Sequence, residues 1–318
     1  MSVLDSIREM VQKAKSILII THENPDGDAV GSSLGFMHGL LKLEKNVDVY
    51  IPRVNKMFSF LPGFDLIKNE LPEDASYDLC VALDSSDLER LAEGRKWFEK
   101  MEKTIVIDHH ITNQNFGDAN YVNAVASSTC QNIIVVLAAM EVAINKDMAT
   151  CIYTGMLTDT GGFRYNVQSE TFEFASMMME AGVNIAEIYR HVFDLTTEAR
   201  TRLLGRALTR LEILENGKVA FTYVTADDWN EFGNQDGDHE NIVNYGRNIE
   251  GVEVSIMLRE KDGQYKVSLR SNDYVDVSII ASKYAGGGHL RASGFAVPGP
   301  LEQAKETVLA EIKKQLKD

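Results

Sequence analysis

The sequence predicts an α/β protein of two domains, with a parallel sheet in the first domain and a smaller α/β domain after it. Apolar runs alternate with helical stretches over the first half of the chain. The pattern is mostly helical from residue 129 to 214, and strand signals return after Gly217. The length of 318 residues accommodates two ordinary domains.

Four apolar runs in the first half have the length and composition of buried strands. They cover residues 16–20, 47–51, 79–83 and 104–107, and helical stretches at residues 31–43 and 88–100 lie between them. Because strands that alternate with helices form parallel sheets covered on both faces, we expect that arrangement here.

Further helices are expected after the last of these strands, at residues 129–142, 147–157 and 170–180. The polar segment 198–214 is expected to connect the domains, and its Arg202, Arg206 and Arg210 share a helix face that we interpret as solvated rather than as substrate-binding. The second domain is expected to contain strands at 218–225, 252–259 and 265–270, and helices at 275–284 and 301–317. The expected boundaries are therefore 1–196, 197–216 for the connector, and 217–318.

Composition and charge restrict the class of protein. A hydrophobic fraction of 44% and a charged fraction of 25% are typical of a soluble globular protein, and we expect neither a membrane span nor a secretory signal. Cys80, Cys130 and Cys151 lack metal-like spacing, so buried free thiols and a cytoplasmic location are expected. A net charge of −15 argues against binding to long nucleic acid, which requires rows of Lys and Arg, and favours a short phosphate substrate.

Acidic and histidine residues follow the apolar strands of the first half. His22, Asp26 and Asp28 follow the first strand, Asp84 follows the third, and Asp108, His109 and His110 follow the fourth. Taken singly, such residues are more often turn formers, helix caps or solvated loop residues. However, parallel sheets place their ligand crevice at the carboxyl ends of the strands, where converging carboxylates would repel one another without cations. The sequence therefore predicts a metal site.

Asp159 is a sixth candidate ligand. It ends an apolar helical stretch, where the helix dipole disfavours a negative charge, and two glycines that allow close backbone approach follow it. Four carboxylates and two imidazoles suit Mn²⁺, with Mg²⁺, Fe²⁺ or Co²⁺ as alternatives. Six ligands are too many for one metal with open positions, so we expect two metals that share a carboxylate and promote phosphoryl displacement.

A glycine run in the second domain, Gly286, Gly287 and Gly288, is followed by His289. A flexible turn is the default interpretation of such a run, but consecutive backbone N–H groups also cradle anions, and His289 is placed to donate to one. Arg270 and Ser271, at the end of a predicted strand, are candidate phosphate ligands or ordinary surface residues.

These motifs together resemble the DHH phosphoesterase family in its DHH/DHHA1 branch. His22, Pro25, Asp26 and Asp28 are similar to the first motif, Asp84 to the second and Asp159 to the fourth, while Asp108-His109-His110 is the triplet that names the family. Gly286 to His289, with Ala292 and Gly294, is similar to the DHHA1 signature.

The resemblance implies a role for each of these residues. One manganese ion would be held by His22, Asp26 and Asp84, and the other by Asp28, Asp84, His109 and Asp159. His110 would face the scissile phosphate, as a donor or general acid. Asp108 would support the site without binding a metal ion directly. Across an interdomain cleft, the DHHA1 domain would hold the nucleotide through Arg270, Ser271 and the loop from Gly286 to His289.

The length favours the oligoribonuclease and bisphosphate nucleotide phosphatase group of the family, since additional DNA-binding or sensor segments have no room in this chain. We therefore expect metal-dependent hydrolysis of RNA of two to about five nucleotides, and of 3′-phosphoadenosine 5′-phosphate. The alternatives are a cyclic- or linear-dinucleotide phosphodiesterase and a non-catalytic nucleotide-binding regulator. The oligomeric state stays open, and a homodimer is compatible with the sequence.

Overall fold

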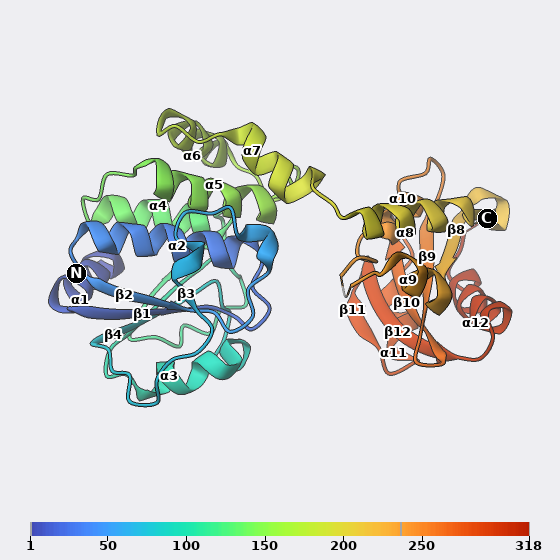
Figure 1. The fold of residues 1–318 in the computed structure, drawn as a ribbon, viewed down its shortest axis with the longest axis horizontal. Helices are drawn as coiled ribbons and strands as arrows, with labels where there is room; N and C mark the ends of the chain where they lie inside the picture. The colour runs from blue at the N-terminus through green and yellow to red at the C-terminus, as the bar shows by residue number, and fades with distance from the viewer. Residues whose placement is uncertain (1, 236, 318) are drawn as a thin grey trace. The chain divides into compact units, whose positions relative to one another are not determined.

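The computed structural model describes residues 2–235 and 237–317, which divide into two compact units at Leu195 and Thr196. Each unit is built on a six-stranded sheet with helices packed against it (Figure 1). The predicted α/β class with two domains is therefore confirmed. In the described part of the chain, no helix combines the length and the apolar character needed to cross a membrane.

The sheet of the first unit is entirely parallel, with the strand order β3-β2-β1-β4-β5-β6. The four predicted strands are confirmed as β1 (Ser16–Ile20), β2 (Asn46–Tyr50), β4 (Leu79–Leu83) and β5 (Thr104–Asp108). The edge strands β3 (Ile67–Lys68) and β6 (Ala119–Val122) are short and half-exposed, and for this reason they lack the apolar runs that reveal buried strands.

The strand order of this sheet reverses between β1 and β4. In open parallel sheets, the connections on the two sides of such a switch point run to opposite faces, which leaves a crevice at the carboxyl ends of the two strands. His22 follows β1 and Asp84 follows β4. The topology thus places candidate metal ligands at the switch point.

Helices cover both faces of the first sheet, as predicted. One face carries α1 (Val3–Lys13), α2 (Gly27–Lys42), α4 (Thr129–Ala139) and α5 (Lys146–Asp159), and the other carries α3 (Arg95–Lys100) (Figure 1). The predicted helix 88–100 is interrupted, because a 3₁₀ segment, η3 (Glu89–Gly94), contains Ala92 at φ 42°. The unit also contains α6 (Ser169–Glu180), α7 (Ile185–Tyr189) and the short turns η1 (Lys56–Phe58), η2 (Phe64–Leu66) and η4 (Arg190–Asp194).

Helix α2 begins at Gly27, earlier than predicted, because the Asp26 side chain caps it. Its glycines serve close packing against the neighbouring helices. A Cβ at Gly31 would lie 2.5 Å from the carbonyl oxygen of Cys151, and a Cβ at Gly155 of α5 would lie 2.2 Å from Cys130 Sγ. Close approach of α2, α4 and α5 brings the start of α2 and the end of α5 to the same edge of the sheet.

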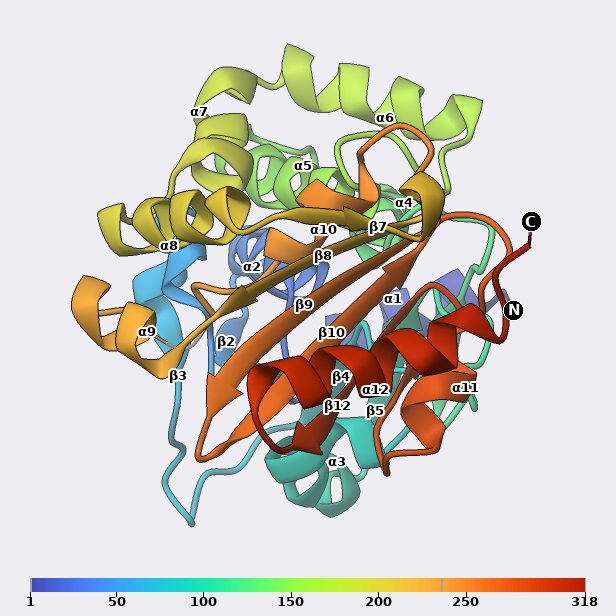
Figure 2. The same ribbon diagram turned by 90° about the vertical axis from the view of Figure 1, so that its right-hand side faces the viewer.

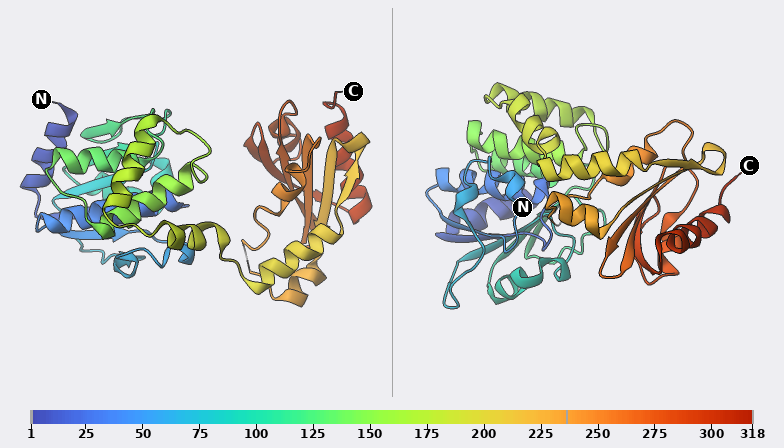
Figure 3. Two further views of the ribbon diagram at one scale, coloured as in Figure 1. Left: turned by 90° about the horizontal axis from the view of Figure 1, so that it is seen from above. Right: turned by 45° about the vertical axis from the view of Figure 1, so that its right-hand side comes forward.

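The second unit has a mixed sheet of strand order β11-β12-β10-β9-β8-β7, in which only β8 and β9 pair in parallel. Helices α11 (Val277–Ser282) and α12 (Leu301–Lys313) cover one face (Figures 2 and 3). Helices α8 (Glu198–Thr209) and α10 (Ile242–Arg247) pack on the other face, and α9 (Ala226–Phe232) packs beside α8. The strands are β7 (Glu212–Leu214), β8 (Val219–Val224), β9 (Val254–Lys261), β10 (Gln264–Ser271), β11 (Gly287–His289) and β12 (Ala292–Pro298), with the turn η5 (Glu215–Gly217) after β7.

The segment 197–216 contains α8 and β7 and belongs to the second unit. Its arginines are not a bare solvated face. Arg206 and Arg210 both donate to the buried carboxylate of Asp228, while the exposed Arg202 pairs with Glu198 at 2.8 Å. The arginine face therefore contributes to the stability of the second unit.

Candidate metal centre and substrate face

Six of the predicted residues lie together at the carboxyl edge of the first sheet. Among the described residues, three overlapping groups have ligand atoms no more than 4.8 Å apart: His22 with Asp26 and Asp84, Asp28 with His109 and Asp159, and Asp84 with His109 and the neighbouring His110. The residues come from the ends of β1, β4 and β5, the start of α2 and the end of α5. We call these six residues the ligand cluster.

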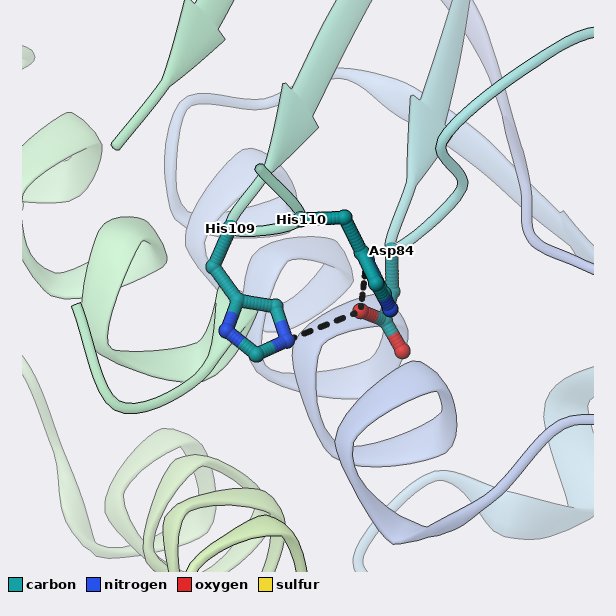
Figure 4. A group of neighbouring side chains, drawn as sticks. All are labelled: Asp84, His109 and His110. Carbon is teal, nitrogen blue, oxygen red and sulfur yellow. Dashed lines mark ion pairs between the residues drawn. The ribbon is translucent and has the colours of Figure 1, made fainter. Parts of the chain in front are cut away.

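Asp84 connects these groups, because it belongs to two of them and contacts a histidine of the third. His22 Nε2 is 3.5 Å from its Oδ2. His109 Nε2 is 3.8 Å from its Oδ1, as Figure 4 shows. Its backbone has φ 55°, in the left-handed region that aspartate tolerates better than most residues. The Thr129 hydroxyl donates to Oδ1 at 3.0 Å, which fixes the carboxylate.

Asp28 is buried against the first turn of α4. Its carboxylate accepts hydrogen bonds from the backbone N–H groups of Thr129 at 2.6 Å and Cys130 at 2.9 Å. A helix N-terminus favours a negative charge there. Even so, burial and the neighbouring Asp84 raise the pKa of Asp28 well above its usual range.

His109 presents Nε2 to the carboxylates. Its Nδ1 lies 3.4 Å from the carbonyl oxygen of Ala126, and this contact favours the tautomer with the proton on Nδ1. Nε2 lies 3.5 Å from Asp159 Oδ2 and 4.0 Å from Asp28 Oδ2. The ring is therefore oriented as a metal-binding histidine would be.

The electrostatics of the ligand cluster favour cations. Burial raises the pKa of Asp159 to about 6, and nearby Asp84 adds to the effect. The pKa of Asp84 itself is lowered, because a hydrogen bond from His22 and the charge of His109 outweigh burial. Carboxylates that are this crowded repel one another, so some of them keep a proton at higher pH than others. A bound divalent cation would reduce this repulsion. The oxygen and imidazole donors fit such an ion.

His110 lies beside Asp84 and His109 of the ligand cluster but is hydrogen-bonded to a residue outside it. Its Nδ1 lies 2.7 Å from Oδ1 of the fully buried Asp108, whose Oδ2 accepts from Asn113 Nδ2 at 2.7 Å. The same Nδ1 is 3.7 Å from Asp84 Oδ1 (Figure 4), so the bond to Asp108 competes with any metal role. The bond to Asp108 raises the pKa of His110.

Two predicted substrate residues of the second unit, Arg270 and His289, lie on one face of its sheet. Arg270 pairs in register with Ala292, which pairs with His289. Side chains of paired residues share a face, so Arg270 and His289 flank the small Ala292. The predicted glycine loop is a β-strand in part, since Gly287 and Gly288 belong to β11. Gly286 and Gly288 lie so close to β12 that a Cβ would approach a carbonyl oxygen of that strand to 2.4 Å.

Ser271 is placed differently from Arg270. Its hydroxyl is buried and donates to the carbonyl oxygen of Val275 at 2.7 Å. The strand alternation directs neighbouring side chains to opposite faces. The structure therefore brings Arg270 and His289 together but does not bring the Ser271 hydroxyl to the same face.

Two supporting residues were missed from the sequence. Thr129 contacts both Asp28 and Asp84, and Asn113 holds Asp108. The only sequence signal for Thr129 was its position after Ser128, which caps α4. Nothing local indicates that these side chains reach residues far away in the sequence.

The parallel sheet, with its cluster of carboxylates and imidazoles at the topological switch point, defines an α/β metal-dependent hydrolase. Family models match as the DHH family, N-terminal domain, over residues 16–156 and as the DHHA1 domain over residues 216–318. The chain belongs to the DHH family of phosphoesterases, in the branch that carries a DHHA1 domain.

Similar proteins of known name or structure match nearly the whole chain. The bifunctional oligoribonuclease and PAP phosphatase NrnA of Thermus thermophilus is 31% identical, over 94% of this chain and 90% of that protein. The protein of the same name from Bacillus subtilis is 29% identical over 89% of each chain. The crystal structure of an exopolyphosphatase-related protein from Bacteroides fragilis has a TM-score of 0.87 and 32% identity, and the match covers 98% of this chain and 96% of that one.

Proposed function

We propose that the protein hydrolyses RNA of two to about five nucleotides and the bisphosphate nucleotide 3′-phosphoadenosine 5′-phosphate. The observation that carries the proposal is the arrangement of the ligand cluster as overlapping groups of ligand atoms that Asp84 connects. Relatives named as oligoribonucleases and PAP phosphatases support the substrate class. The net charge of −15 supports a short substrate over long nucleic acid. Such a substrate also agrees with a cytoplasmic enzyme.

In this proposal the ligand cluster holds two divalent ions, with manganese as the favoured metal. His22, Asp26 and Asp84 hold one ion, and Asp28, Asp84, His109 and Asp159 hold the other. When bound, two such ions neutralise phosphate charge and lower the pKa of a water molecule. The oxygen-rich donor set without thiolates supports Mn²⁺, with Mg²⁺ and Co²⁺ as alternatives.

In this proposal His110 supplies proton donation, and the second unit supplies nucleotide binding. With Nδ1 bonded to Asp108, His110 directs Nε2 to the substrate, where it donates to the oxygen of the scissile phosphate or of the leaving group. Arg270, His289 and the glycines 286–288 hold the nucleotide, and Ser271 supports the strand end that carries Arg270. A site that grips one nucleotide end limits the length of the substrate.

A substrate panel with Mn²⁺ tests the proposal. We expect turnover of a dinucleotide, a five-mer and the bisphosphate nucleotide. A long single strand should react at least about 100-fold more slowly, because a chain with a net charge of −15 lacks the general electrostatic attraction that long nucleic acid requires. Initial rates measured by chromatography compare these substrates with a cyclic dinucleotide. A preference for the cyclic or the long substrate would contradict the proposal, and tight binding without turnover would favour a non-catalytic regulator.

The affinity for metal should depend on pH. The pKa of Asp159 is raised to about 6 from its ordinary value of 3.8, so its protonated form stabilises the metal-free fold below pH 4. That contribution is lost as the pH rises through 6, because Asp159 then loses its proton. Above this pH a metal ion can bind the carboxylate without displacing a proton. Mn²⁺ should therefore raise Tm more at pH 7.5 than at pH 5. Calorimetric scans with EDTA or Mn²⁺ measure this difference, and equal shifts at the two pH values would refute the expectation.

A further inference from the structure

The first turn of helix α4 supports several residues of the ligand cluster at once. The backbone N–H of Thr129 donates to Asp28 at 2.6 Å, and its hydroxyl donates to Asp84 at 3.0 Å. In the same turn, Asn132 Nδ2 donates at 2.9 Å to the carbonyl oxygen of Asp108. The position of this turn therefore determines where two of the carboxylates lie.

The segment 126–128, which leads into α4, orients a third member of the ligand cluster. The carbonyl oxygen of Ala126 lies 3.4 Å from His109 Nδ1. The Ser128 hydroxyl caps the helix by accepting from the backbone N–H of Gln131 at 3.1 Å. This short segment thus contacts one imidazole and begins the helix that supports Asp28 and Asp84.

The side chain of Gln131 returns to this segment and ties it to α6. Gln131 is almost completely buried, and its Oε1 accepts from the Ser127 N–H at 3.1 Å and from the Ser127 hydroxyl at 2.8 Å. The same oxygen accepts from the hydroxyl of Thr171 at 3.1 Å, while Nε2 donates to Glu170 Oε2 at 3.0 Å. Both of these partners belong to the first turn of α6.

The chemistry of these contacts requires an acceptor and a donor on one side chain. A backbone N–H and two hydroxyls face Oε1, and a carboxylate faces Nε2, so the orientation of the amide is determined by its partners. An apolar side chain of similar size would leave buried donors of Ser127 and Thr171 without this acceptor. Such donors are costly to leave unpaired, so the segment would shift toward other acceptors.

We propose that Gln131 is a positioning residue for the metal centre, because it fixes the segment 126–128 and through it the arrangement of His109, Asp28 and Asp84. This inference rests on the proposed metal-dependent function. Residues that orient metal ligands without binding the metal typically change metal affinity or activity by about 10–100-fold when they are replaced. The contacts with Glu170 and Thr171 make α6 part of the same support.

Titration calorimetry of the full chain with Mn²⁺ tests the proposal. Gln131→Met keeps the approximate size of the side chain and should weaken Mn²⁺ binding by about 10–100-fold. The double variant Gln131→Glu/Glu170→Gln exchanges the two partners and keeps the net charge. The carboxylate introduced at position 131 can accept from the same three donors, so affinity should return to within about threefold of the wild type. Glu173→Gln, an exposed change on the same helix, is the control and should bind Mn²⁺ as the wild type does.

The ring of His109 provides a second measurement that needs no metal. In EDTA at alkaline pH, where imidazole is neutral, ¹⁵N NMR should show the tautomer with the proton on Nδ1 in the wild type and in the double variant. Gln131→Met should show a mixture of the two tautomers. If the wild type bound no Mn²⁺, the proposed function would fail, and this measurement would still decide the role of Gln131.

A role in stability alone would give a different result. Gln131→Met would then lower Tm but keep the Mn²⁺ affinity and the His109 tautomer of the wild type, and this outcome would overturn the proposal. A double variant that binds Mn²⁺ no better than Gln131→Met would do the same. If Gln131→Met does not fold, the isosteric Thr171→Val, which removes one donor to Oε1, takes its place, and wild-type values of both measurements would be negative.

Discussion

Replacement of Asp84 by Asn is expected to reduce kcat on a dinucleotide by about 10³-fold or more in Mn²⁺. Asp84 lies within 4 Å of both His22 and His109, so in the two-metal proposal it is the carboxylate that would serve both metal positions. Asn keeps the size of the side chain and tolerates the φ of 55°, so the backbone should not change. The loss should come from the missing charge, since a neutral amide is a poor bridging ligand.

Metal stoichiometry separates this explanation from misfolding. Equilibrium dialysis followed by metal analysis should show about two Mn²⁺ per wild-type chain, and Asp84→Asn should bind fewer with an unchanged far-UV CD spectrum. Asp78→Asn is a matched control, because Asp78 bonds the backbone N–H groups of Lys15 at 2.8 Å and Ser16 at 2.9 Å, at the amino end of β1. This variant should keep wild-type kcat. Undiminished turnover by Asp84→Asn would refute the two-metal proposal.

The buried strands and the residues at their ends were predictable from the sequence. The runs that became β1, β4 and β5 are apolar and bounded by polar residues, and parallel sheets bring such strand ends to one edge. This reasoning was sufficient to place His22, Asp84 and His109 near one another. It needed no knowledge of the loops between the strands, because topology alone determines which ends meet.

Contacts between segments distant in sequence were not predictable. Asp28 looks like an ordinary first-turn residue of α2, yet its carboxylate bonds the backbone of Thr129, 101 residues away. The glycines before His289 suggested a free loop, because glycine disfavours strands, but close pairing with β12 places Gly287 and Gly288 in β11. In both cases tertiary packing, which a local pattern does not contain, decided the outcome.

His110 and Asp108 are expected to act together as a proton-donating pair. Because Nδ1 of His110 is held by Asp108 at 2.7 Å, only Nε2 is free to face a substrate. His110→Ala should lower kcat by about 10²–10³-fold, the usual range for a lost general acid. If His110 is not a ligand, this variant should still bind two Mn²⁺. A loss of metal in His110→Ala would instead assign it to the metal site, and unchanged kcat would remove it from the reaction.

The pH profile tests the role of Asp108 in this pair. The Asp108 carboxylate raises the pKa of His110, so the protonated donor persists to higher pH in the wild type. In Asp108→Asn that support is lost, and the alkaline limb of kcat should move to lower pH, toward the ordinary histidine value near 6.5. NMR titration of the His110 ring in both proteins measures the same shift without turnover. If Asp108 served only in packing, the alkaline limb of kcat would stay in place in Asp108→Asn, because Asn fills the same space and lacks only the charge.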